Sequence, residues 1–169
     1  MMRIVDGALA IPGLLLLVVL CTIISPTVPI LILIVAAQAW LVPARLIRAE
    51  SLSLRTRDFV DAARGMGGGR FWIIKRHIVP NAVGTILVNM TFQIADAIII
   101  IAYLSFLGFG IPPPATNWGA MLSSGLNFAI TGYWWLIYPP GIAIVLTVIA
   151  FNFIADGLRE TFDVRLRLR

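Results

Sequence analysis

The chain has 169 residues, of which 60% are hydrophobic and 12% are charged. Soluble domains carry roughly a quarter charged residues, so this composition excludes a soluble globular protein and predicts a membrane protein. The mean hydropathy of +0.96 agrees. The formal net charge is +5, but the basic residues flank apolar runs and form no recognition motif. We therefore expect no nucleic-acid partner, and we expect the basic residues to contact anionic membrane lipids.

We expect an all-α, polytopic membrane fold that forms one domain over residues 1–169. A helix needs about 20 apolar residues to cross the hydrocarbon core of a bilayer. Uncharged runs of about this length predict four spans, at residues 8–24, 29–44, 82–109 and 132–155. The first run could instead be a cleavable signal peptide. It is interpreted as a span because no convincing small-residue cleavage site follows it.

The positions of the basic residues orient these spans. Lys and Arg lie before the first span, around a central segment at residues 48–81, and after the last span, as follows: Arg3; Arg45, Arg48, Arg55, Arg57, Arg64, Arg70, Lys75 and Arg76; Arg159, Arg165, Arg167 and Arg169. Residues 110–131 carry no charge. By the positive-inside rule, both termini and the central segment are expected in the cytoplasm, and residues 110–131 are expected to form an outer loop.

The central segment is predicted to form two short helices along the membrane surface. Asp58 is expected to cap the first helix, with Asp61 completing an aspartate version of the capping box. The glycine-rich residues 65–69 are expected to break that helix, because glycine is costly in helices and permits left-handed turns. A second helix is expected at residues 70–77 and is expected to end at Pro80, with these apolar residues on its membrane face: Phe71, Ile74 and Ile78.

Polar side chains recur along the third predicted span, at spacings that place them on one face of a helix. They are Thr85, Asn89, Gln93 and Asp96. A carboxylate within a bilayer is costly unless it is paired or hydrated, so this face is not expected to meet lipid. It could line a translocation pathway or clamp neighbouring helices by hydrogen bonds, and the sequence leaves both alternatives open.

No catalytic, cofactor or metal site is expected. His77 has no second His or Cys at ligand spacing and no Ser and Asp partners in a convincing order, so a helix-end hydrogen bond beside Pro80 is the favoured interpretation. Residues 65–69 lack the lysine of a phosphate-binding loop, which places any ATP hydrolysis on another chain. Aromatic residues near the outer loop are expected to be interfacial anchors: Trp118, Phe128, Tyr133, Trp134 and Trp135.

Several ordered sequence blocks resemble one family. Asp61-Ala62-Ala63, then Gly67, then Ile78-Val79-Pro80 resemble the Glu-Ala-Ala loop of binding-protein-dependent importers, and His77 and Asn81 resemble the dipeptide, oligopeptide and nickel branch. The blocks at residues 2–16, 44–50, 104–110, 112–122 and 143–159 agree with that branch. The resemblance therefore covers nearly the whole chain.

The resemblance implies a partial type I ABC importer permease, a subunit of an ATP-driven importer for peptides, nickel or related small solutes. Residues 48–81 would form its ATPase-coupling loop, with these residues in the motif: Asp61, Ala62, Ala63, Gly67, His77 and Pro80. Small side chains at Ala62 and Ala63 would form the tip of a docking knob. The implied partners are ABC ATP-binding subunits, a second and usually different permease subunit, and an extracytoplasmic solute-binding protein. The implied location is a bacterial or archaeal inner membrane.

The chain departs from the family pattern in three respects. Asp61 replaces the usual Glu, and Ile101 occupies a position that is often acidic. Family members typically have about six spans, so the chain is expected to begin just before the third. Three alternatives follow: an ATPase-independent scaffold or channel, a non-functional truncated fragment and, more distantly, a membrane-embedded hydrolase.

Overall fold

The computed structural model describes residues 2–167, and the side chains only as far as residue 161. Arg169 and the side chains of Arg165 and Arg167 lie outside this description. Helices are the only regular secondary structure in the described part, so the predicted all-α class is confirmed. In chain order the elements are α1 (Met2–Leu9), α2 (Gly13–Ile23), α3 (Val28–Ala39), α4 (Leu41–Leu54), α5 (Asp58–Gly65), α6 (Arg70–Ile73), a π-helical turn (Ile74–Ile78), α7 (Val79–Phe106), α8 (Trp118–Leu126), 3-10 turns at Ala129–Thr131 and Trp134–Leu136, and α9 (Tyr138–Arg167).

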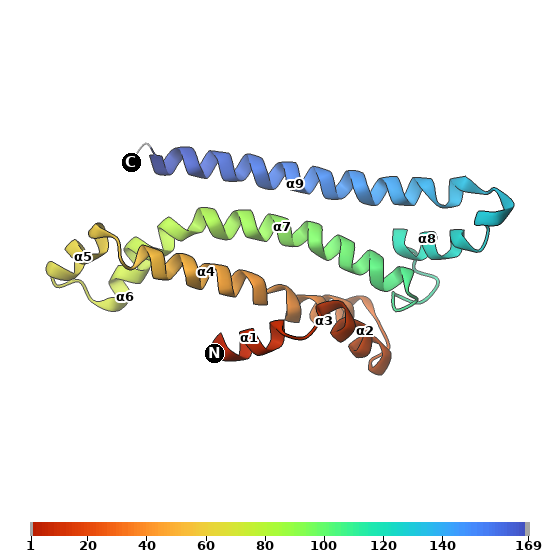
Figure 1. Cartoon of the computed structure of the whole chain (residues 1–169), viewed down its shortest axis with the longest axis horizontal. Coiled ribbons are helices and arrows are strands. Elements are labelled where there is room, and N and C mark those ends of the chain that lie inside the picture. The colour runs from red at the N-terminus through yellow and green to blue at the C-terminus, as the bar shows by residue number, and fades with distance from the viewer. Residues whose placement is uncertain (1, 168–169) are drawn as a thin grey trace.

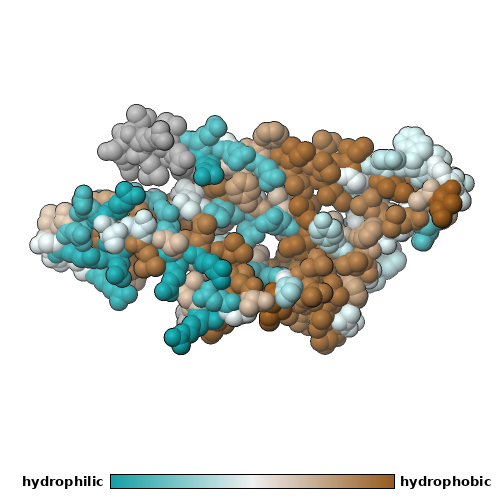
Figure 2. All heavy atoms as spheres, in the orientation of Figure 1, coloured by the Kyte–Doolittle hydropathy of each residue, from teal (hydrophilic) through white to brown (hydrophobic). Residues whose placement is uncertain are grey.

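The long helices lie side by side, with α7 between α9 and α4 (Figure 1). Helices α5 and α6 project at one end, where α9 also finishes, and α8 lies at the other. Hydrophilic residues gather over the end that carries α5 and α6, whereas the middle of the molecule is hydrophobic (Figure 2). We call the end with α5 and α6 the polar end.

Among the described residues, three helical stretches are long and apolar enough to cross a membrane: Val28–Leu54, Arg70–Phe106 and Trp134–Thr161. A fourth candidate is the pair α1 and α2, which is bent by 87°. The span expected over residues 8–24 is therefore not one continuous helix, because the chain turns between Leu9 and Gly13 around Pro12. The stretch Val28–Leu54 corresponds to the second predicted span but extends beyond its expected end at residue 44. Arg45 and Arg48 therefore lie on helix α4 rather than in a loop.

The joint between α3 and α4 follows from a proline. Pro43 has no N–H with which to bond the carbonyl four residues earlier, at Ala39, where α3 ends. The next residue resumes the helical pattern, since the Ala44 N–H donates to the Trp40 carbonyl over 3.0 Å. A side chain from α7 takes the vacant place, because Gln93 Nε2 donates to the Ala39 carbonyl. This bond ties α7 to the α3–α4 joint.

The expectation that Pro80 ends the second surface helix is wrong. The chain stays helical from α6 through the π-helical turn into α7, with Pro80 in the first turn of α7. A π turn carries its hydrogen bonds to the fifth residue, and here the Val79 N–H donates to the Ile74 carbonyl. The wider turn accommodates a residue without a backbone donor. The polar end and the α7 span thus form one continuous helical stretch.

Helix α8 was not predicted within the expected outer loop. Asn117 caps it, because its Oδ1 accepts from the Ala120 N–H over 2.9 Å. Gly119 lies so close to α7 that a Cβ there would come 2.2 Å from the Ala102 carbonyl oxygen. A short helix with a glycine at its contact can therefore lie against α7 where a larger side chain could not. The main apolar core lies nearby and consists of Leu17, Cys21, Leu31, Ile34 and Leu104.

Candidate coupling and pathway residues

Helices α5 and α6, with the π turn, form a compact structure that we call the α5–α6 unit (residues 58–78). Its small core consists of Val60, Ala63 and Ile73, with Ile78 packed against them. Val60 and Ala63 are 0% and 1% exposed, although the unit projects from the end of the molecule. Apolar residues spaced three apart on α5 meet one face of α6, which explains why two such short helices remain together.

Two glycines shape the turn between these helices. Gly67 has a φ of +82°, a conformation that residues with a Cβ rarely adopt. The Gly68 N–H donates to the Ala63 carbonyl over 3.0 Å, and a Cβ at Gly68 would lie 2.7 Å from that carbonyl oxygen. The sequence singled out Gly67, whereas the requirement at Gly68 depends on packing that the sequence does not reveal.

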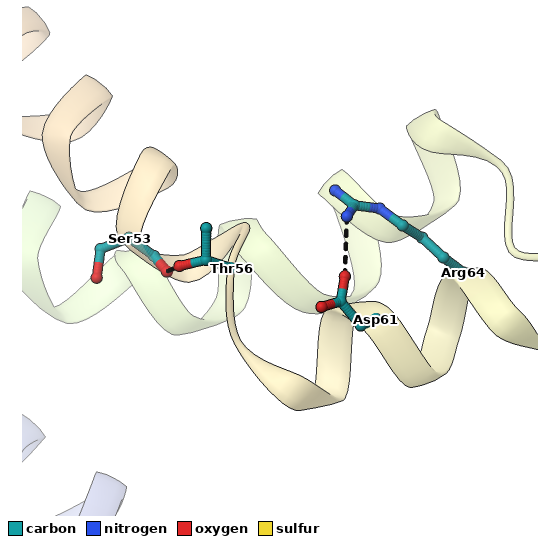
Figure 3. A network of polar contacts seen from close by, with 4 residues as sticks. All are labelled: Ser53, Thr56, Asp61 and Arg64. Carbon is teal, nitrogen blue, oxygen red and sulfur yellow. Dashed lines mark hydrogen bonds and ion pairs between the residues drawn. The ribbon is translucent and has the colours of Figure 1, made fainter.

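The expected capping box at Asp58 is wrong. The residue that caps α5 is Arg57, without a side-chain hydrogen bond, and both aspartates lie in the first helical turn. There they place negative charge at the positive end of the helix dipole. Asp61 pairs with Arg64, one turn along, at 2.9 Å (Figure 3). Because both side chains are exposed, this pair contributes little stability and the Asp61 carboxylate remains accessible.

The six expected motif residues divide into two groups. Asp61, Ala62, Gly67 and Pro80 are exposed, whereas Ala63 and His77 are not. The expectation that Ala63 lies at the tip of a knob is therefore wrong, because Ala63 packs inside the unit. A small residue is needed there to let α5 and α6 approach each other.

His77 is held by aromatic rings rather than by the expected hydrogen bond. Its ring lies 5.1 Å from Trp72 and 6.2 Å from Phe59, measured between centroids. Nε2 is buried and makes no hydrogen bond within the described side chains. The His77 backbone carbonyl, not its ring, makes the nearby hydrogen bond, which it accepts from Asn81 Nδ2 over 2.6 Å. His77 thus joins α5 to α6.

The outward face of the α5–α6 unit combines apolar and basic side chains. Met66 and Phe71 are 79% and 82% exposed. Phe71 and Trp72 lie with Lys75 and Arg76 around a shallow hollow of about 760 Å³. Exposed large apolar side chains of this kind mark a contact with another protein or with the membrane surface, the latter being the role expected for Phe71 from the sequence.

The four polar residues expected on one face of α7 do not share one environment. Asn89 Nδ2 donates to the Thr85 carbonyl over 2.8 Å, within the helix, and Gln93 bonds to Ala39 as described above. Asp96 is exposed and forms no ion pair among the described side chains. Gln93 therefore acts as a clamp between helices, whereas Asp96 faces outward from this chain.

Apolar helices of spanning length, joined at a polar end that carries a small helical unit, define a polytopic helical membrane protein. The family model described as "Binding-protein-dependent transport system inner membrane component" matches residues 1–168. The chain belongs to this family, so the resemblance inferred from the sequence blocks is confirmed. The family consists of ABC transporter permeases, which are transport proteins rather than enzymes.

Curated relatives of the chain are also named as transport permeases. A "Putative peptide permease protein" of Brucella ovis is 45% identical over 169 residues, which cover 99% of this chain and 56% of the relative. A "Putative peptide transport system permease protein" of Brucella abortus is 41% identical over 170 residues, with the same coverage. The "Dipeptide transport system permease protein DppC" of Bacillus subtilis is 35% identical over 167 residues, which cover 99% of this chain and 52% of the relative. The chain spans about half the length of the curated relatives it matches.

Proposed function

We propose that this chain serves as a membrane-spanning permease subunit of an ATP-driven importer for peptides or related small solutes. The proposed solute class rests on the relatives, which are named peptide and dipeptide permeases. Its partners would be ABC ATP-binding subunits, a second permease subunit and an extracytoplasmic solute-binding protein. The polar end and both termini would face the cytoplasm.

The observation that carries the proposal is the outward face of the α5–α6 unit. Asp61, Ala62 and Gly67 are exposed on this unit, as are Met66 and Phe71, while Ala63 and His77 hold the unit together from inside. A surface of this kind suits a groove on a soluble ATP-binding subunit. Because the helical path from α6 into α7 is continuous, movement of the docked unit would be transmitted to the span.

The position of Asp96 supports the proposal that the chain lines a solute pathway. A carboxylate that this chain leaves uncovered on a spanning helix needs water or a partner subunit around it. We propose that Asp96, with the polar face of α7 formed by Thr85, Asn89 and Gln93, borders the solute pathway.

The test is co-purification of the chain with an ABC ATP-binding subunit, from membranes in which both are expressed. Asp61→Arg reverses the charge at the docking face and should reduce recovery of the ATP-binding subunit at least tenfold. Asp156→Arg is the matched control, because it makes the same charge change at an exposed site on α9, and it should leave recovery unchanged.

The outcomes separate the proposal from its alternatives. Recovery that depends on Asp61 but not on Asp156 supports a coupled permease. Unchanged recovery in the Asp61→Arg variant, with both variants inserted stably, would overturn the proposed docking face. No recovery with the unsubstituted chain would favour a scaffold or channel that works without an ATPase.

A further inference from the structure

A groove runs between α4 and the start of α7, close to the polar end. It encloses about 810 Å³, a volume within the range of small-molecule sites. One wall is the face of α4 that carries Arg48, Ser51 and Arg55, which are spaced three and four residues apart and so lie on one stripe. The opposite wall is formed by α6, the π turn and the first turns of α7, and the α5–α6 turn lies beside it.

Four arginines line the groove, and its lining includes no acidic residue. They are Arg48, Arg55, Arg64 and Arg70. Arg64 pairs with Asp61, whereas the other three form no ion pair among the described side chains. Guanidinium groups match the geometry of phosphate oxygens, and their convergence from both walls makes the groove complementary to an anion.

The remaining lining of the groove is mostly apolar. On the α7 side it includes Ile74, Ile78, Ala82 and Ile86, each four residues from the next, which places them in a row from the π turn into the α7 span. A small hydrated anion would leave this row unused. The groove therefore fits a ligand with an anionic head and a long apolar tail.

We propose that this groove is a binding site for one anionic phospholipid. The phosphodiester of the lipid contacts Arg48 and Arg55 on α4 and Arg70 at the start of α6, and one acyl chain lies along the isoleucine row. Basic pockets between helices at the cytoplasmic side of membrane proteins bind anionic headgroups in this way. A lipid seated here contacts both α4 and the α6–α7 helix, so it stabilises the position of the α5–α6 unit. Arg70 lines both this groove and the hollow on the outward face, whereas Arg48 and Arg55 lie on α4 and line only the groove, so the test substitutes these two residues.

The proposal is tested with the 169-residue chain in detergent micelles and spin-labelled phosphatidylglycerol, with spin-labelled phosphatidylcholine as the uncharged comparison. One motionally restricted phosphatidylglycerol per chain is expected. The double variant Arg48→Gln/Arg55→Gln should weaken its binding by about 30-fold, from about one tenfold step per 1.4 kcal/mol and about 1 kcal/mol per basic residue. The control Arg57→Gln/Arg76→Gln removes the same charge from exposed residues outside the groove and should change binding less than threefold.

Two further measurements distinguish a lipid from free phosphate as the ligand and distinguish lost charge from misfolding. Arg48→Lys/Arg55→Lys keeps both charges and should retain most of the affinity. Millimolar inorganic phosphate should leave the bound lipid in place, because phosphate cannot use the isoleucine row. The proposal is overturned by equal losses in the two glutamine double variants, by no preference for phosphatidylglycerol over phosphatidylcholine, or by displacement with inorganic phosphate. None of these results bears on ATPase recruitment, so the two proposals fail separately.

Discussion

Single residues in the α5–α6 unit have roles that their exposure distinguishes. Ala62 and Ala63 are adjacent and identical in type, yet Ala62 is exposed whereas Ala63 is buried against the unit. The sequence blocks identified both alanines as motif residues but could not separate them, because burial depends on how α5 packs against Ile73 of α6. The same holds for Gly68, whose need for a missing Cβ arises from the nearby Ala63 carbonyl and Trp72 ring.

Gly67→Ala tests the turn at this scale. At a φ of +82° an added Cβ costs about 1 kcal/mol, so the turn should open more often. Hydrogen exchange of the Gly68 amide, which donates to Ala63, should speed up about fivefold. Gly65→Ala is the matched control, because Gly65 has no positive φ and has open space at its Cβ position. In this variant the exchange of the Gly68 amide should stay the same or slow down. Equal rates in the two variants would contradict the role given to Gly67.

Two helix joints in this chain form where prolines remove backbone donors. The sequence predicted most of the helices, because apolar runs and glycine-rich breaks mark them clearly. It did not predict that a glutamine from another helix would bond to the carbonyl left vacant by Pro43, or that a π turn would carry the helix into Pro80. Both solutions depend on neighbouring geometry, which no local pattern encodes. Helix α8 was missed because its nine residues are fewer than the window of about 11 to 18 residues over which a helical period is recognised.

A double-mutant cycle tests the bond between Gln93 and the α3–α4 joint. Gln93→Leu should lower the free energy of unfolding by about 1 kcal/mol, because the Ala39 carbonyl loses its partner. Pro43→Ala supplies a backbone N–H to that carbonyl, so in its presence Gln93→Leu should cost much less. Denaturant unfolding in mixed micelles measures each step. Strictly additive costs would show that the two residues do not share this carbonyl.

For the whole molecule, the sequence predicted a helical membrane protein with a charged end, and the structure agrees. It also placed Thr85, Asn89, Gln93 and Asp96 on one face of a single helix, but it could not decide between a pathway and a clamp. Gln93 bonds to another helix, while Asp96 does not. The reason is that α3 has a vacant carbonyl beside Gln93, and the sequence does not show which helices become neighbours.

Asp96→Leu tests the pathway role at this scale. If Asp96 borders the solute path, uptake of a labelled dipeptide into proteoliposomes with the assembled importer should fall at least tenfold, because the hydrated carboxylate is lost. Co-purification of the partner subunits should be unchanged. Asp96→Asn keeps a polar group and should retain more uptake than Asp96→Leu. Loss of assembly with Asp96→Leu would instead assign Asp96 to a contact between subunits.

The most direct test of ATPase coupling is site-directed cross-linking from α5. In a Cys21→Ala background, Ala62→Cys should cross-link efficiently to the ATP-binding subunit, because residue 62 is exposed on the proposed docking face. Ala63→Cys, one residue along but buried, should react weakly, and Ala115→Cys, exposed near α8 at the opposite end, should give no cross-link. Failure of Ala62→Cys to cross-link, or equal yields from residues 62 and 115, would contradict the account.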